Sequence, residues 1–205
     1  MSERVEGAGV ELAATVRGAG PPVLLVHDMA ADARMWAPLA AALADEARTI
    51  AYDRRGYGDS GAPEPYGRTT VHEQEEDARA VLRAFGADGG DALAVGAGFG
   101  ALVVLDLLVR MPALLRGAVL VAPPVNQLAE TATAVLSDQR TLLEQALRDA
   151  GPETAVEAWR PGADGAVRAA HRAFPADFGG LASWPVSRRE LRAIAVPVAV
   201  VTGSG

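Results

Sequence analysis

The chain has 205 residues, of which 50% are hydrophobic and 22% charged, enough apolar material for a sizeable globular core. This length predicts one domain or at most two. The chain contains no cysteine, which excludes disulfides, zinc–thiolate sites and a cysteine nucleophile. The net charge is -7, and the basic residues form no stripe with interleaved aromatics, so we expect no nucleic-acid partner.

The chain shows no pattern of a targeting or membrane-spanning segment. Its first residues include glutamates and lack the basic start and apolar run of a signal peptide. The most apolar stretch, Ala101–Val109, is short and interrupted by Asp106, so we expect no membrane contact. The default expectation is a cytoplasmic protein. All 19 basic residues are arginine, and this bias together with the high alanine and glycine content indicates a GC-rich bacterial genome.

Strand and helix patterns alternate along residues 1–124. Short apolar runs bounded by turns predict buried strands, and apolar residues at helical spacing predict the helices between them. The predicted strands are Val10–Val16, Pro22–His27, Thr49–Tyr52, Ala92–Val95 and Ala118–Ala122. The predicted helices are Met35–Asp45, Thr70–Phe85 and Ala101–Arg110. This order predicts an α/β fold, a mainly parallel sheet with helices on both faces.

The strand rhythm stops over residues 125–192, which we interpret as a helical cap inserted into the core. Two helix candidates, Leu128–Ala150 and Thr154–Trp159, precede a loop-rich stretch with Trp184 and Pro185. Another buried strand follows at Val196–Thr202. The predicted organisation is a core over 1–124, a cap over 125–192 and a further core strand within 193–205.

In open α/β sheets, ligands bind outside the carboxyl ends of the strands, so the turns at those ends carry the information about function. They read His27-Asp28-Met29, then DRRGYGDS over Asp53–Ser60, then GAGFG over Gly96–Gly100. These motifs resemble the H-G-x turn, the D-x-R-G-x-G-x-S loop and the G-x-S-x-G nucleophile elbow of the α/β-hydrolase superfamily. The resemblance covers nearly all of the chain and implies the α/β-hydrolase fold with a helical cap, without a cofactor or a metal.

The resemblance places the catalytic nucleophile at position 98, where this chain has Gly98. Glycine offers no nucleophile, whereas the mechanism needs serine, cysteine or aspartate. The expected acid and the expected histidine would both follow residue 205. The sequence therefore predicts a catalytically impaired hydrolase homologue. The backbone amides of Met29 and Phe99 would form a relic oxyanion hole, with His27 and Asp28 at the pocket mouth, and the expected ligand is a small apolar carbonyl compound.

The ionisable residues near these turns have plainer interpretations as well. We expect His27 to orient the backbone of its turn, His72 to be a solvated residue near a helix start, and His171 to be part of the cap. Asp28 is either a turn-capping residue or an acid–base group for lyase or hydration chemistry, and the first is favoured because it has no partner carboxylate. We expect Asp53 to be structural.

Three alternatives stay open. Gly96–Ala101 also fits G-x-G-x-x-A, the dinucleotide fingerprint, although that motif normally opens the first βαβ unit. A lyase or cofactor-free cyclase would need no nucleophile and would use a histidine beyond residue 205. A protein-interaction module is the third, and a sheet without the family's last strand and helix would self-associate through its edge. The H-D turn and the glycine elbow are similar to the N-myc downstream-regulated family, whose members look non-enzymatic.

Overall fold

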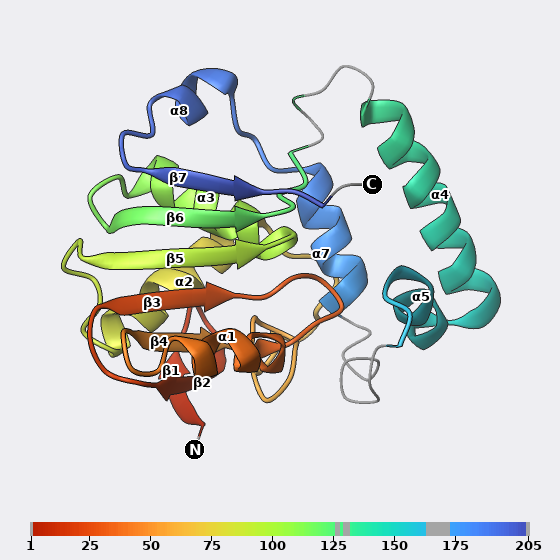
Figure 1. Ribbon diagram of the computed structural model, residues 1–205. Helices are drawn as coiled ribbons and strands as arrows, with labels where there is room; N and C mark the ends of the chain where they lie inside the picture. Colours follow the sequence, from red (N-terminus) through yellow and green to blue (C-terminus); the bar gives the residue numbers. More distant parts are fainter. Residues whose placement is uncertain (1, 126–127, 129–131, 163–172, 204–205) are drawn as a thin grey trace.

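The protein is described from a computed structural model that places residues 2–125, 128, 132–162 and 173–203. A seven-stranded sheet in the order β1-β2-β4-β3-β5-β6-β7 forms its centre (Figure 1). All neighbours from β4 to β7 pair in parallel, whereas β1 and β2 pair with each other and β2 with β4 in antiparallel fashion. The predicted α/β fold with a mainly parallel sheet is confirmed.

The strands form where the sequence offers short apolar runs. The strands are β1 Glu3–Glu6, β2 Glu11–Arg17, β3 Pro22–Val26, β4 Arg48–Tyr52, β5 Ala92–Ala97, β6 Leu115–Val121 and β7 Val198–Val201. All five residues of β3 are buried, as expected of a central parallel strand covered on both faces. Our sequence analysis did not predict β1, because only one of its four side chains is buried and it has no apolar run.

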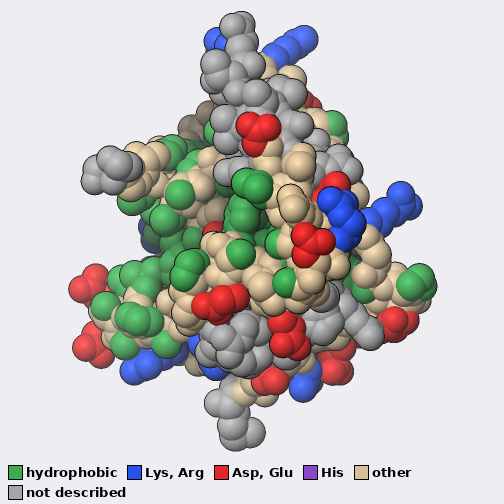
Figure 2. All heavy atoms as spheres, turned by 90° about the vertical axis from the view of Figure 1, so that its right-hand side faces the viewer, with side chains coloured by type: hydrophobic (Ala, Val, Ile, Leu, Met, Phe, Trp, Pro, Cys, Tyr) green, Lys and Arg blue, Asp and Glu red, His purple; other side chains and the backbone are tan. Residues whose placement is uncertain are grey.

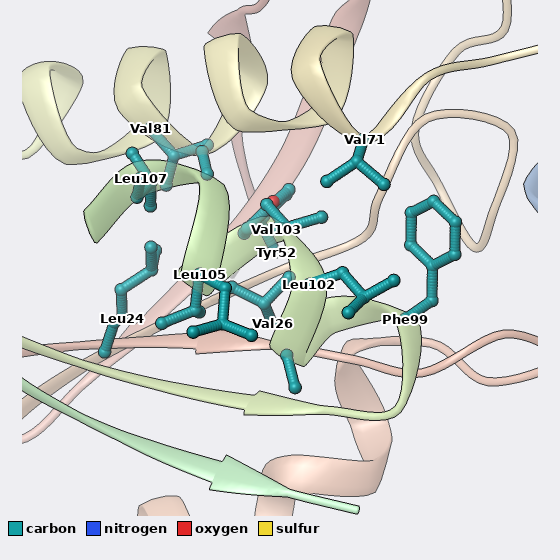
Figure 3. Packing of buried hydrophobic residues seen from close by; sticks show 14 of the residues in the cluster. Leu24, Val26, Tyr52, Val71, Val81, Phe99, Leu102, Val103, Leu105 and Leu107 are labelled. Carbon is teal, nitrogen blue, oxygen red and sulfur yellow. The ribbon is translucent and has the colours of Figure 1, made fainter. Parts of the chain in front are cut away.

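Helices cover the two faces of the sheet unequally. α2 (Val71–Ala84) and α3 (Phe99–Arg110) lie on one face, and η1 (Ala33–Trp36) with α1 (Ala37–Ala42) lies on the other (Figure 1). α3 is the most deeply buried helix and packs its leucines and valines between β3 and α2 (Figure 3). The elbow at the start of α3 is therefore held by the main core of the molecule.

In the part of the chain that the structure describes, three helices of the segment predicted as a cap lie beyond the carboxyl ends of the strands (Figure 1). They are α4 Ala132–Ala150, α5 Pro152–Trp159 and α7 Ala173–Ala182. The stretch that we expected to be loop-rich contains α7 and the short α8 (Arg188–Arg192), which contacts α3. α7 forms because Phe174, Phe178 and Leu181 bury against the core, and a capping box between Ser187 and Glu190 starts α8.

The far edge of the sheet is the least covered part of the core. Val198, Val200 and Val201 of β7 are 37%, 58% and 49% exposed. An apolar hollow of about 480 Å³ lies beside α1, against the same face of β3, β5 and β6. Among the described residues, no helix combines the length and the apolar character needed to cross a membrane.

Candidate active site

The turn between β5 and α3 has the geometry of a nucleophile elbow. Gly98 lies between the last residue of the strand and the first residue of the helix, with φ +49° and ψ -119°. This is a backbone conformation that costs other residues strain. A side chain on Gly96 would overlap the Gly100 carbonyl, so the flanking glycines allow strand and helix to approach closely. The backbone of the elbow is thus in place, with Gly98 at its centre.

The backbone amides of Met29 and Phe99 converge on one point, as an oxyanion hole requires. Both donate to Oδ1 of Asp28, at 2.7 Å from Met29 and 2.8 Å from Phe99. By the resemblance to hydrolases, this is the place that the charged oxygen of a tetrahedral intermediate would take. The structure therefore brings together the two amides that the sequence indicated, and the Asp28 carboxylate accepts from both.

Asp28 and Gly98 depend on each other sterically. A Cβ built on Gly98 would overlap the Asp28 carboxylate, with Oδ1 as its nearest neighbour. Any side chain at position 98 therefore excludes the observed position of Asp28. The aspartate in the first turn and the glycine in the elbow therefore form a sterically matched pair.

The second carboxylate oxygen of Asp28 is left free. Oδ2 accepts no hydrogen bond from the described residues. It is also not one of the fully enclosed polar atoms among them, so it remains accessible. The residue itself is half-buried. Burial raises the pKa of the Asp28 carboxyl, while the amides of Phe99 and Met29 and the charge of Arg54 act in the opposite direction. The site therefore presents one open hydrogen-bond acceptor.

His27 lies beneath the turn and is fully buried, so it does not line a pocket mouth. Its Nδ1–H donates to the Asp28 carbonyl at 2.8 Å, and its Nε2 accepts from the Arg54 amide at 2.8 Å. Burial, followed by the charge of Arg54, holds its pKa well below the usual range. A neutral ring with both nitrogens engaged orients the backbone, in line with the interpretation from sequence.

Arg54 connects the turn to the cap. Its buried guanidinium donates from Nε to the His27 carbonyl at 2.9 Å and from Nη2 to Asp177 Oδ2 at 2.7 Å. It also lies over the ring of Phe99, 4.8 Å from the ring centroid. One side chain from the loop after β4 thus contacts the turn after β3, the start of α3 and the cap helix α7.

Asp177 is the cap's contribution to this buried network. Its carboxylate also accepts from the Tyr57 hydroxyl at 2.8 Å and from Gln74 Nε2 at 2.7 Å. Asp177 is fully buried, so α7 is fixed to the core by charge-assisted hydrogen bonds. Our sequence analysis named neither Asp177 nor Gln74 as site residues, because they lie far apart in the chain and match no local motif.

A second ionisable cluster lies away from the elbow, between α2 and α3. Among the described residues, only His72, Glu75 and Asp106 offer ligand atoms close enough to share a metal ion. Asp106 is already held by the Arg110 Nε at 2.8 Å and the Trp184 indole N–H at 2.9 Å. We therefore describe the cluster as an ion-pair network that joins two helices. His72 is half-exposed, and His171 lies outside the described residues.

An apolar pocket lies in the cap, between α4 and α5. It has a volume of about 460 Å³ and is lined by Leu142, Leu143, Ala146, Ala155, Ala158 and Trp159. Arg160, which follows Trp159 at the end of α5, donates to the carbonyl of Ala30 at 3.4 Å. The end of α5 therefore adjoins the turn that carries Asp28. Hydrophobic side chains surround a hollow on this side of the molecule (Figure 2).

Comparison with known proteins shows the family to which the chain is related. The family model described as "Alpha/beta hydrolase family" matches residues 23–204. The chain is 29% identical over 119 residues to "2-(acetamidomethylene)succinate hydrolase" of Mesorhizobium japonicum, a match that covers 58% of this chain and 41% of that protein. It is 34% identical over 86 residues to "Fluoroacetate dehalogenase" of a Burkholderia species, covering 40% of this chain and 28% of that protein.

Solved structures resemble the whole chain. An esterase from Thermogutta terrifontis superposes with a TM-score of 0.79 at 23% identity, covering 99% of this chain and 80% of that one. This identity supports the fold alone. The chain spans about two fifths of the length of the first curated relatives it matches, 41% of the Mesorhizobium protein.

Proposed function

Because the chain belongs to the alpha/beta hydrolase family, we propose that it is a hydrolase homologue that forms no acyl-enzyme and instead binds a small molecule beneath its cap. The observation that carries this proposal is the Asp28 carboxylate in the oxyanion hole. A substrate carbonyl would have to displace an anion from two amide donors. Gly98 offers no attacking atom even if it did so.

The geometry argues against the dinucleotide alternative. In that fingerprint, the first amides of the helix bind a pyrophosphate. Here the Phe99 amide, the first of α3, is occupied by Asp28, and a phosphate beside that carboxylate would meet like charge. The pocket of the cap, lined by leucine, alanine and tryptophan, supports a ligand with an apolar body instead.

Labelling and turnover test the proposal directly. We expect the purified protein to hydrolyse p-nitrophenyl acetate no faster than buffer and to show no fluorophosphonate adduct by intact-mass spectrometry. A phosphonate adduct mapped to any serine, or ester turnover that survives removal of trace contaminants, would overturn the proposal. A bona fide serine esterase processed in parallel shows that the reagents are active.

A pair of variants tests the steric link between the two departures. We expect Gly98→Ser alone to lower the stability of the protein, because the new side chain and Asp28 compete for one space. Adding Asp28→Gly should recover part of that loss, with a coupling energy of about 1–3 kcal/mol in a double-mutant cycle followed by urea unfolding. Strictly additive effects would mean that the two positions do not exclude each other.

A further inference from the structure

The hydrogen-bonding character of this site is reversed relative to an open oxyanion hole. An open hole presents two N–H donors and selects an acceptor, the carbonyl or oxyanion oxygen. In this protein both donors are taken by Asp28 Oδ1, and the group left facing outward is Asp28 Oδ2. A carboxylate oxygen only accepts hydrogen bonds. The site therefore repels the carbonyl ligand that two free amides would have favoured.

We infer that the site recognises its ligand through a hydrogen-bond donor, an alcohol hydroxyl or a protonated amine, carried on an apolar body. This inference rests on the proposed function, because it assigns the chemical class of the ligand bound beneath the cap. It follows from which atoms of Asp28 are engaged and which one is free. The backbone amides of Met29 and Phe99 fix the carboxylate in place, so the acceptor is positioned before any ligand arrives.

The charges around Asp28 favour the amine over the hydroxyl. The guanidinium of Arg54 is matched by Asp177 in a buried ion pair, with Nη2 and Oδ2 2.7 Å apart. His27 is neutral, since its Nε2 accepts the Arg54 amide hydrogen. Arg160 brings a positive charge to the Ala30 carbonyl at 3.4 Å, but among the described residues no cation forms an ion pair with Asp28. A ligand ammonium would supply that missing charge in a charge-assisted bond.

The apolar body of the ligand has matching surfaces in the cap. Trp159 packs edge-on against Phe174 and Phe178, with ring centroids 5.6 and 6.1 Å apart. Trp159 also lines the pocket between α4 and α5. The adjoining Arg160 contacts the turn that holds Asp28. An aromatic or aliphatic group of modest size fits these surroundings better than a polar one.

Three probes with one carbon skeleton separate the ligand classes: 1-phenylethylamine, 1-phenylethanol and acetophenone. They carry an ammonium, a hydroxyl and a carbonyl at the same position. Binding to the full chain is measured by NMR titration at mildly alkaline pH, which favours the carboxylate form of an aspartate and keeps the amine protonated. The backbone amide signals of Met29 and Phe99 report on the site. We expect the amine to bind about tenfold or more tightly than acetophenone, with the alcohol between them.

Variants at Asp28 should change this order in opposite ways. Asp28→Asn keeps an oxygen on the two amides and turns an NH₂ donor outward, so the preference for the amine should be lost. Asp28→Gly frees both amides, so acetophenone should become the preferred probe. Asp138→Asn is the matched control, because it removes the same charge from an exposed position on α4 and should leave the order unchanged.

The outcomes distinguish this inference from the proposed function. Preference for the donors in the parent protein, reversed in Asp28→Gly, supports both. Equal or tighter binding of acetophenone by the parent protein overturns the assignment of ligand class and leaves a small-molecule site standing. If no probe binds the parent protein or either Asp28 variant, the inference falls together with the pocket of the proposed function.

Discussion

Two aspartates follow neighbouring strands and are built into the protein in nearly the same way. Asp28 follows β3 and fits against Gly98, and Asp53 follows β4 and fits against Gly58. Both glycines have positive φ, +49° and +51°, and a Cβ on either would overlap the partner carboxylate. In each case a glycine of left-handed conformation makes room for a carboxylate that accepts backbone amides.

The difference between them lies in how the oxygens are used. Asp53 accepts from Ala33 with Oδ1 at 2.8 Å and from Asp59 with Oδ2 at 2.9 Å, so each oxygen ties down a loop. Asp28 gives one oxygen to both of its amides and leaves the other free. Both oxygens of Asp53 therefore serve to hold loops in place, which is a structural role. The arrangement at Asp28 leaves an acceptor with no structural task, which is why we assign ligand recognition to Asp28 and not to Asp53.

The largest expected loss of stability comes from replacing Arg54, which links the turn after β3 to the cap helix α7. Arg54→Met leaves Asp177 buried without its cation and removes the donor to the His27 carbonyl, so we expect a loss of about 3–5 kcal/mol in the free energy of unfolding. Urea denaturation measures this loss.

An exposed arginine provides the control for this substitution. Arg148→Met breaks the pair between Arg148 and Glu144 on α4, where the arginine side chain is 66% exposed, and should cost at most about 1 kcal/mol. The double variant Arg54→Met with Asp177→Leu should recover much of the stability that Arg54→Met loses, because no buried charge is then left unpaired. Equal losses for Arg54→Met and Arg148→Met would contradict the role of Arg54 as the link.

Local patterns in the sequence were sufficient for the fold and for the elbow. The apolar runs of β3 and β5 and the glycines around Gly98 are signals within a few residues, and the family model and solved structures bear out the fold that they predict. The position of the Asp28 side chain could not be predicted this way. It depends on Phe99, 71 residues later in the chain, whose amide completes the pair of donors.

The anchoring of the cap was also beyond the sequence. Asp177 lies 123 residues from Arg54, within a segment that we expected to be loop-rich. Nothing in its neighbours indicates a buried carboxylate, since its burial is decided by Arg54, Gln74 and Tyr57 on the core. A contact between residues so far apart in the chain leaves no periodic pattern in the sequence.

Replacing each aspartate by alanine tests the comparison itself. Asp53→Ala should cost about 2 kcal/mol, because the amides of Ala33 and Asp59 lose their acceptor within packed loops. Asp28→Ala should cost less than about 1 kcal/mol, since it removes a partly desolvated charge and opens its two amides to water. Thermal or urea unfolding at neutral pH measures both. A larger loss for Asp28→Ala would make it the structural residue of the two.

The smallest effect is a pH dependence that belongs to Asp28. Burial raises its pKa above the usual value for an aspartate, so near that range the folded protein holds more protons than the unfolded chain. Stability contributed by this group therefore falls as the pH rises from the unfolded value through the folded one, and stays constant above it. Asp28→Asn does not titrate, so its stability relative to the parent should increase over this window and then level off. Urea denaturation at a series of pH values checks the difference. A difference that moves in the opposite direction would mean that the two amides outweigh burial, and Asp28 would then stabilise the fold as an anion in the way that a purely structural cap does.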